Sequence, residues 1–181
     1  MNIVLIGYRC CGKSAVGKLL AEKLGWDFVD SDALIQLRSG RPIPQIVAED
    51  GWAVFRDYER QVISELARKN NLVIATGGGA VLDDRNVAQL QENGWLVWLQ
   101  AGPETIGDRM AADIGTGQVR PSLTGADPVA EITAVLLERE PHYDNAGDIA
   151  IDTGSLALQE VVDRIIDSLP PDFGAGSSPR H

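Results

Sequence analysis

The sequence predicts an α/β protein built on a doubly wound sheet of five parallel strands flanked by helices. Short apolar segments typical of strands alternate along the chain with segments in which apolar residues recur at helical spacing. One strand segment, WLVWLQ, has almost no polar residues, as expected of a strand buried on both faces. Of the 181 residues, 44% are hydrophobic, enough to fill the core of one domain. We therefore expect a single domain over residues 1–169.

The charge balance argues against nucleic acid and membranes as partners. The chain has 16 Lys and Arg residues against 26 Asp and Glu, a net charge of −10, whereas nucleic acids and anionic membranes attract basic surfaces. No apolar run is long enough to span a membrane, and no secretory signal pattern opens the chain. Cys10 and Cys11 are adjacent, a poor arrangement for a structural disulfide. We expect a cytoplasmic protein whose cysteines fill loop positions, with a redox-sensitive loop as the alternative.

A phosphate-binding motif joins the first strand to the first helix. The apolar residues 3–6 are followed by GYRCCGKS, and a helix pattern begins directly afterwards. Gly7, Gly12, Lys13 and Ser14 fit the pattern GxxxxGK[ST]. In such loops backbone N–H groups point at phosphate oxygens, the lysine reaches the β and γ phosphates, and the hydroxyl can bind Mg²⁺. The flanking strand and helix favour a nucleotide loop over a plain glycine-rich turn.

Two carboxylates end the second strand segment. WDFVDSD is interpreted as a short buried strand in which Asp30 and Asp32, two residues apart, point the same way. At the carboxyl edge of an open α/β sheet they could serve a metal and a substrate hydroxyl. The alternative is that Ser31 or Asp32 only caps the helix that begins near Ala33.

A possible anion-binding arginine follows. The segment from Ser39 predicts a turn, a short helix and a longer helix, and Arg56 lies near the start of the longer one, three residues before Glu59. This is the spacing of a salt-bridged pair on a helix. The pair is either simply solvated, or Glu59 fixes a guanidinium that can hold a carboxylate with two parallel hydrogen bonds.

The third strand segment, which begins at Leu72, runs into three consecutive glycines, Gly77, Gly78 and Gly79. Such a run loses much backbone entropy on folding, so it indicates a close approach of backbone and ligand or an unusual turn, with a plain loop as the alternative. The strand ends in Thr76, where many nucleotide hydrolases have an aspartate for Mg²⁺. Metal binding is therefore expected to fall to Ser14 and Asp30.

The second half of the chain carries three further arginines of interest. Arg109 lies in a predicted helix after the strand WLVWLQ, and Arg120 lies in residues 112–124, which have no period and many small residues. That composition predicts a mobile lid able to deliver a cation, with an ordinary surface loop as the alternative. Arg139 precedes Pro141, which is expected to interrupt and kink its helix. After a fifth strand and a last helix, residues 170–181 are expected to be disordered.

The motifs GYRCCGKS, DSD, FRDYE, GGG, RP and REPHY occur in this order over residues 2–168. This ordered set resembles the shikimate kinase family, small kinases with a phosphate loop and a mobile lid that are related to the nucleoside monophosphate kinases. The resemblance implies ATP-dependent phosphorylation of the 3-hydroxyl of shikimate, within chorismate and aromatic amino acid biosynthesis. It also implies Mg²⁺ as cofactor and a monomer.

The resemblance also implies roles for residues. Lys13, Asp32 and Arg120 would be catalytic, with Asp32 nearest the reacting hydroxyl; Ser14 and Asp30 would hold Mg²⁺. The residues that would contact ATP are Cys10, Cys11, Gly12, Lys13, Ser14, Ala15, Arg109 and Arg120. Those that would contact shikimate are Asp32, Arg56, Gly77, Gly78, Gly79 and Arg139.

Two departures from the family pattern and three alternatives remain. Cys10 occupies a position where the family commonly has glycine, and DTGSLAL lacks a basic residue for adenine. A kinase of the same fold acting on another small acid or alcohol, such as gluconate, is the first alternative; a nucleoside monophosphate kinase is less compatible with DSD and GGG. A catalytically silent nucleotide-binding switch would be expected to lack Lys13, Asp32 or Arg120, and all three are present. A GTPase is not supported, because the guanine-reading motif NKxD is absent from the sequence.

Overall fold

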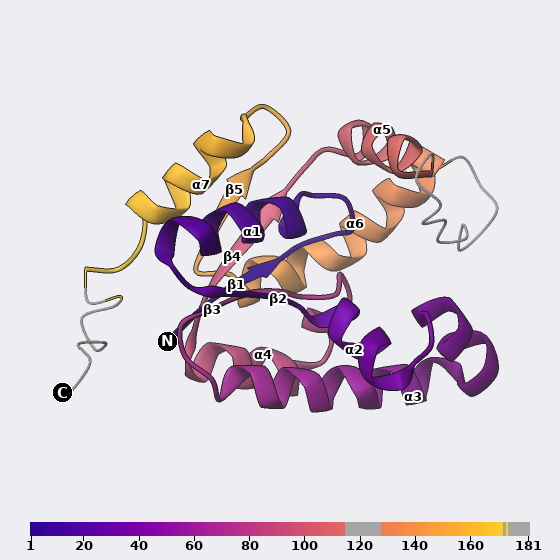
Figure 1. Ribbon diagram of the computed structural model, residues 1–181. Coiled ribbons are helices and arrows are strands. Elements are labelled where there is room, and N and C mark those ends of the chain that lie inside the picture. Colours follow the sequence, from indigo (N-terminus) through magenta and orange to yellow (C-terminus); the bar gives the residue numbers. More distant parts are fainter. Residues whose placement is uncertain (115–127, 172, 174–181) are drawn as a thin grey trace.

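Five strands form one sheet at the centre of the molecule, in the order β2-β3-β1-β4-β5 (Figure 1). The computed structural model describes residues 1–114, 128–171 and 173. Every pairing between neighbouring strands is parallel, which confirms the predicted fold class. The strands are β1 (Asn2–Ile6), β2 (Asp27–Asp30), β3 (Leu72–Ala75), β4 (Gly94–Gln100) and β5 (Ile149–Asp152).

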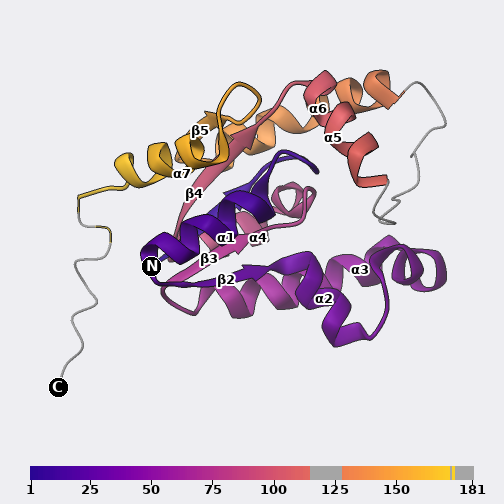
Figure 2. The same cartoon turned by 45° about the horizontal axis from the view of Figure 1, so that its top comes forward.

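Helices cover both faces of the sheet, as a doubly wound fold requires. Helices α1 and α7 pack together on one face, and α3, α4 and α6 lie on the other (Figure 1). Helix α5 packs along α6 (Figure 2). None of the helices in the described ranges is both long and apolar enough to cross a lipid bilayer. The helices are α1 (Lys13–Leu24), α2 (Ser31–Ser39), α3 (Ile43–Ala67), the 3₁₀ helix η1 (Ala80–Leu82), α4 (Asp84–Glu92), α5 (Pro103–Ile114), α6 (Pro128–Ala146) and α7 (Leu158–Asp167).

The central strand β1 shows how the two layers are built. Successive side chains of a strand point to opposite faces. Ile3 and Leu5 accordingly join the apolar cluster under α1 and α7, and Val4 and Ile6 join the cluster under α3, α4 and α6. All four side chains are fully buried, so β1 holds the two layers together and its carboxyl end is fixed in place.

The second strand differs from its expected environment. β2 lies at the edge of the sheet, and all four of its residues keep some exposure, so the expectation of a buried strand is wrong. Asp30 is its last residue, whereas Asp32 already belongs to the first turn of α2. The two carboxylates therefore do not share a strand face, and what brings both to the carboxyl edge is the direct passage from strand to helix.

Two predicted helix breaks had different outcomes. Gly51, with φ 86° and ψ 168°, interrupts the helical backbone inside α3, which agrees with the expected short helix followed by a longer one. The expected interruption at Pro141 is wrong, because α6 continues through this proline to Ala146. Arg139 and Tyr143 therefore lie one turn apart on one helix, on the same side of it.

The segments with the least sequence pattern are described in part. Residues 112–114 of the expected lid form the end of α5, and residues 115–124 lie outside the described residues. In the expected tail, Phe173 packs near two tryptophan rings, with centroid distances of 6.0 Å to Trp26 and 6.1 Å to Trp95. Residues 172 and 174–181 lie outside the described part.

Asp83 links the stability of this fold to pH. It caps α4 and accepts three hydrogen bonds from Arg85, which with Arg60 lower the pKa of Asp83 from 3.8 to about 2. A carboxylate with a lowered pKa stabilises the fold above its unfolded pKa and loses that contribution as the pH falls through the folded pKa.

Asp83→Asn keeps a capping side chain but removes the charge, so it should lower the free energy of unfolding by about 1 to 2 kcal/mol at pH 7. Urea unfolding at pH 7, 5, 4 and 3 measures the difference from wild type, which should be constant above about pH 5 and shrink progressively below it, as the unfolded carboxyl of pKa 3.8 takes up a proton. A difference that does not change with pH would contradict the assignment.

Candidate active site

The phosphate loop lies between the end of β1 and the start of α1. Gly7 has φ 137°, and a Cβ there would clash with the Leu99 carbonyl oxygen, so this position requires glycine. Gly12, with φ 99°, is the N-cap residue of α1. Lys13 Nζ lies 2.7 Å from the carbonyl oxygens of both Gly7 and Tyr8. The loop therefore curls around its own lysine, and its N–H groups and helix start form a typical site for phosphate.

Cys10 adopts a backbone conformation that is typical of glycine. Its φ is 59°, in the left-handed region that costs most non-glycine residues about 1 kcal/mol or more. Its Sγ lies 3.6 Å from a carboxylate oxygen of Asp113 on α5. Burial, and then Asp113, raise the pKa of the Cys10 thiol. Since the thiolate is the reactive form, this environment disfavours the redox-sensitive loop that the sequence left open. Cys11 is buried and, like Cys10, free.

Asp30 caps the helix that follows it and is hydrogen-bonded to Ser14 of the phosphate loop. One carboxylate oxygen accepts hydrogen bonds from the N–H groups of Asp32 and Ala33 at 3.0 and 3.1 Å, so Asp30 caps α2, in place of the expected Ser31 or Asp32. The other accepts from the Ser14 hydroxyl at 2.9 Å. The described residues hold no cluster of three or more His, Cys, Asp or Glu side chains suited to a metal. A hydroxyl and a carboxylate suit Mg²⁺, which takes its other ligands from phosphate and water.

The triple-glycine segment passes between charged side chains. A Cβ at Gly79 would lie 2.5 Å from Arg56 Nη2, and a Cβ at Gly77 would lie 2.6 Å from a carboxylate oxygen of Asp32. The Gly77 N–H donates to Ser31 Oγ at 3.0 Å. These distances explain the glycines at positions 77 and 79: at both, a Cβ would fit only if the side chain of Asp32 or Arg56 moved.

Arg56 is held in place by Glu59, as the helical spacing suggested. Arg56 Nη1 lies 2.6 Å from Glu59 Oε2, and the guanidinium also lies over the rings of Trp52 and Phe55, at 5.7 and 5.2 Å. The Glu59 side chain is only 1% exposed. Burial raises the pKa of Glu59, while Arg56 opposes that shift. The pair is therefore not simply solvated: Glu59 is buried, and it anchors a guanidinium that remains 26% exposed.

Arg139 approaches the same segment from the other side. Its Nη1 donates to the Gly78 carbonyl oxygen at 3.2 Å, and Tyr143, one turn further along α6, donates to the same oxygen at 2.5 Å. A Cβ at Gly78 would lie 3.4 Å from the Arg9 backbone nitrogen of the phosphate loop. The glycine segment thus lies between Arg56 of α3 and Arg139 of α6, directly beside the phosphate loop.

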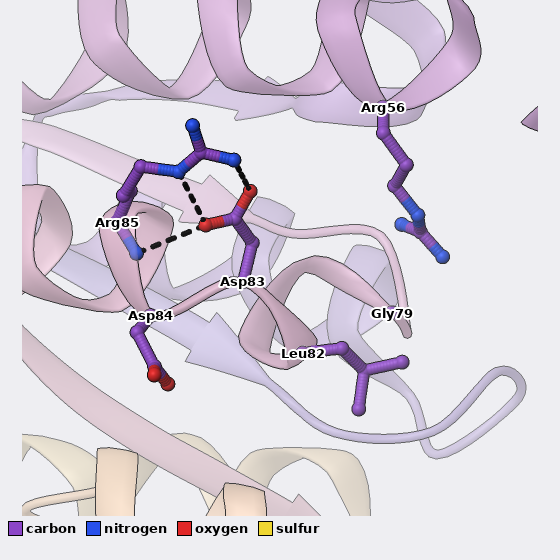
Figure 3. Close-up of a pocket in the computed structure, with 6 residues that line it drawn as sticks. All are labelled: Arg56, Gly79, Leu82, Asp83, Asp84 and Arg85. Carbon is purple, nitrogen blue, oxygen red and sulfur yellow. Dashed lines mark hydrogen bonds and ion pairs between the residues drawn. The ribbon is translucent and has the colours of Figure 1, made fainter. Parts of the chain in front are cut away.

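A pocket of about 570 Å³ opens on the Arg56 side of the segment. Figure 3 shows Arg56 extending from its helix toward the loop of Gly79, while Asp83 and Arg85 are paired on the other side of the pocket. The pocket thus offers the Arg56 guanidinium and the Gly79 backbone to a small ligand, while its second guanidinium, that of Arg85, is paired with Asp83.

Arg109 lies on the opposite side of the phosphate loop. Its guanidinium donates to the Cys10 carbonyl oxygen at 3.2 Å and to the Thr153 carbonyl oxygen at 2.8 Å. Thr153 in turn donates to the Cys11 carbonyl oxygen at 2.9 Å. Arg109 and Thr153 therefore connect the phosphate loop to the end of β5. Arg120 lies outside the described residues.

The sequence analysis gave no role to Tyr143 and Thr153, and it missed the contact that Ser31 makes. A signal existed for Tyr143, because a residue four positions after Arg139 on one helix lies beside it. Ser31 was considered only as a helix cap, yet it accepts a hydrogen bond from Gly77, which is far away in the sequence. Thr153 connects to residues more than 40 positions away, and no local pattern indicates such contacts.

A phosphate loop beside a cradle of arginines and glycine backbone, on a doubly wound α/β sheet, defines a phosphate-loop kinase of small molecules. The family model described as shikimate kinase matches residues 9–170. A shikimate kinase from Symbiobacterium thermophilum is 44% identical over 93% of this chain and 96% of its own length. The structure of the shikimate kinase from Acinetobacter baumannii in complex with shikimate is 34% identical, covers 92% of this chain and 90% of that one, and superposes with a TM-score of 0.84. The chain belongs to the shikimate kinase family.

The structure of a gluconokinase from Sinorhizobium meliloti is also similar, with a TM-score of 0.54 at 18% identity, over 92% of this chain and 89% of that one. This similarity shows a shared fold alone, and it gives no support to gluconate as the substrate.

The crowding at Gly79 makes a direct prediction. Gly79→Ala places a methyl group against the Arg56 guanidinium, which Glu59 prevents from moving far, so the ligand side of the pocket should be distorted. We expect the KM for the acid substrate to rise about tenfold or more, with the melting temperature changed by only a few degrees, since the collision is with the end of a long side chain. Steady-state kinetics and thermal unfolding measure both quantities.

Gly102→Ala is the matched control, because a Cβ at Gly102 meets nothing within 4 Å. An unchanged KM in Gly79→Ala would show that Arg56 does not touch the substrate.

Proposed function

We propose that the protein transfers the γ-phosphoryl group of ATP to the 3-hydroxyl of shikimate, giving shikimate 3-phosphate and ADP. The observation that carries this proposal is the glycine segment, which lies between Arg56 and Arg139 and beside the phosphate loop. An acceptor held on this segment would have its hydroxyl beside the terminal phosphate. The family of the chain and the relatives named above support the same substrate.

The substrate carboxylate would be held by Arg56, Arg139 and the N–H groups of the segment Gly77, Gly78 and Gly79. Guanidinium groups bind carboxylates with paired, charge-assisted hydrogen bonds, which are about twice as strong as neutral ones. Glu59 keeps the Arg56 guanidinium in one orientation before the substrate arrives, so less rotamer entropy is lost on binding. A cradle of this kind selects acids over neutral polyols.

The phosphates of ATP would bind to the loop and the first turn of α1. Gly12, Lys13 and Ser14 provide N–H groups, the ammonium and a hydroxyl. Mg²⁺ would be held by Ser14 and Asp30 and would neutralise charge on the phosphate oxygens. Arg120, from outside the described residues, would stabilise the transferred group. The remaining contacts to ATP are proposed for Cys10, Cys11, Ala15 and Arg109.

Asp32 would orient the acceptor hydroxyl and receive its proton. It lies in the first turn of α2, close to Gly77. Its backbone N–H donates to Asp30, the carboxylate that also accepts a hydrogen bond from Ser14 of the phosphate loop. Phosphoryl transfer passes through a loose transition state in most analyses, so positioning the hydroxyl is the larger contribution and the proton leaves late. Most of the rate would come from charge neutralisation by Lys13 and Arg120.

ATP consumption in a coupled assay with Mg²⁺ tests the function directly. Shikimate, gluconate, a nucleoside monophosphate and no acceptor are compared at equal concentration. Turnover with shikimate at least about a hundredfold above the other acceptors supports the proposal, since sites that hydrogen-bond a substrate reject analogues strongly. Turnover with gluconate instead would replace the substrate and keep the phosphate loop, and ATP binding without any turnover would indicate a silent switch.

Arg56→Ala and Arg139→Ala should each weaken shikimate binding by about 1.5 to 3 kcal/mol, the contribution of a charged hydrogen bond, which corresponds to a tenfold or larger rise in KM. The KM for ATP should stay close to wild type in Arg56→Ala, because the guanidinium of Arg56 is held by Glu59, Trp52 and Phe55 of α3. In Arg139→Ala the KM for ATP should change less than the KM for shikimate, since in the described part of the chain the guanidinium of Arg139 meets the phosphate loop only at the Tyr8 ring, at 5.9 Å from the ring centroid. Arg56→Lys should regain only part of the shikimate affinity that Arg56→Ala loses, because an ammonium cannot make two parallel hydrogen bonds to a carboxylate.

Arg38→Ala, which breaks an exposed ion pair with Glu65, is the control for loss of a positive charge. A shikimate KM that is the same in Arg56→Ala and Arg38→Ala would remove Arg56 from the binding site.

A further inference from the structure

Tyr143 is a fully buried tyrosine whose hydroxyl has a defined partner. The residue is 0% exposed, and its ring stacks on Trp98 with a centroid distance of 5.8 Å. The hydroxyl donates to the Gly78 carbonyl oxygen at 2.5 Å. Burial raises the pKa of Tyr143, so the hydroxyl stays protonated and remains a donor throughout the working pH range. Most buried tyrosine hydroxyls have a hydrogen-bond partner. Here the partner belongs to the glycine segment, which is proposed to bind the substrate.

Because a peptide unit is planar, the hydrogen bond to the Gly78 carbonyl also fixes the direction of the Gly79 N–H. The bond from Gly78 to Gly79 is trans, as are the other peptide bonds in the described ranges. In a trans peptide the C=O and the following N–H point in opposite directions. A Gly78 carbonyl held against α6 therefore turns the Gly79 N–H away from α6. Gly79 lines the pocket that it shares with Arg56.

We propose that Tyr143 is a positioning residue for the acid substrate: by holding the Gly78 carbonyl, it presents the Gly79 N–H to the substrate carboxylate. Tyr143 itself does not touch the substrate. The inference rests on the proposed carboxylate cradle and deepens it, because it adds a residue that acts on the cradle from behind.

The shared acceptor adds a second consequence. Arg139 and Tyr143 both donate to the Gly78 carbonyl oxygen, the tyrosine at 2.5 Å and the arginine at 3.2 Å. The Arg139 Nε is buried and has no hydrogen-bond partner within the described structure. When Arg139 turns toward a substrate carboxylate, Tyr143 still satisfies the carbonyl, so the arginine can leave without exposing an unpaired buried acceptor. Tyr143 thereby makes Arg139 available for binding.

Tyr143→Phe tests the proposal, because it keeps the ring and its stacking on Trp98 and removes only the hydroxyl. We expect the KM and Kd for shikimate to rise about three- to tenfold, the effect of one neutral hydrogen bond. The kcat and the KM for ATP should stay within about twofold of wild type. Tyr58→Phe is the matched control, since Tyr58 packs against the same core cluster from α3 and should leave all constants unchanged.

A purely structural role predicts a different pattern. Loss of folded protein lowers the apparent kcat and leaves both KM values unchanged, so the ratio of the two KM values decides even if the variant is less stable. In ¹H–¹⁵N spectra the Gly79 amide resonance should also move in Tyr143→Phe and not in Tyr58→Phe. An unchanged shikimate KM in Tyr143→Phe would overturn the proposal, whether or not the Gly79 resonance moves.

The shikimate KM values of the arginine variants distinguish failure of the proposed carboxylate cradle from failure of the role proposed for Tyr143. Were Arg56→Ala and Arg139→Ala to leave the shikimate KM unchanged, the cradle itself would be wrong. Were both to raise it while Tyr143→Phe did not, the cradle would stand and only the role of Tyr143 would be lost.

Discussion

Glu59 is a carboxylate with 1% of its side chain exposed, and its burial is compensated chiefly by the Arg56 guanidinium 2.6 Å away. A buried charge is tolerated only when paired, so the pair fixes where Arg56 lies before any ligand binds. That fixed guanidinium leaves little room for a side chain at position 79, which explains the glycine there. The side of the site that is proposed to bind the substrate therefore depends on an ion pair anchored in α3.

The sheet topology then brings this segment to the nucleotide side. β1 and β3 are neighbours in the sheet, so the loops that follow them leave the same edge together, the usual ligand position in open α/β folds. Gly78 lies beside the backbone of the phosphate loop, while Asp30 connects the end of β2 to Ser14 on α1. Because Asp30 also caps α2, the carboxylate that is proposed to support Mg²⁺ also anchors the helix that carries Asp32.

Local patterns were sufficient for the fold class, the phosphate loop and the Arg56–Glu59 pair, because each depends on spacing within one element or on one flanked motif. They were insufficient where distant segments meet. The edge position of β2 depends on strand order, which no strand sequence encodes by itself. Continuation of α6 through Pro141 depends on tertiary packing, since Tyr143 beyond it is fully buried. The contacts of Ser31, Tyr143 and Thr153 to loop backbone carry no local signal beyond the helical spacing of Tyr143 from Arg139.

In the proposed cradle, the preorganised guanidinium of Arg56 binds the carboxylate of the acceptor together with Arg139 and the glycine backbone. Calorimetric titration of the nucleotide-free protein with shikimate and with its methyl ester isolates this interaction, because the ester keeps the ring and hydroxyls but removes the negative charge. If the cradle binds the carboxylate, the ester should bind at least about tenfold more weakly, as expected for the loss of a charged hydrogen bond. Equal affinities for acid and ester would contradict it and would transfer recognition to the hydroxyl groups alone.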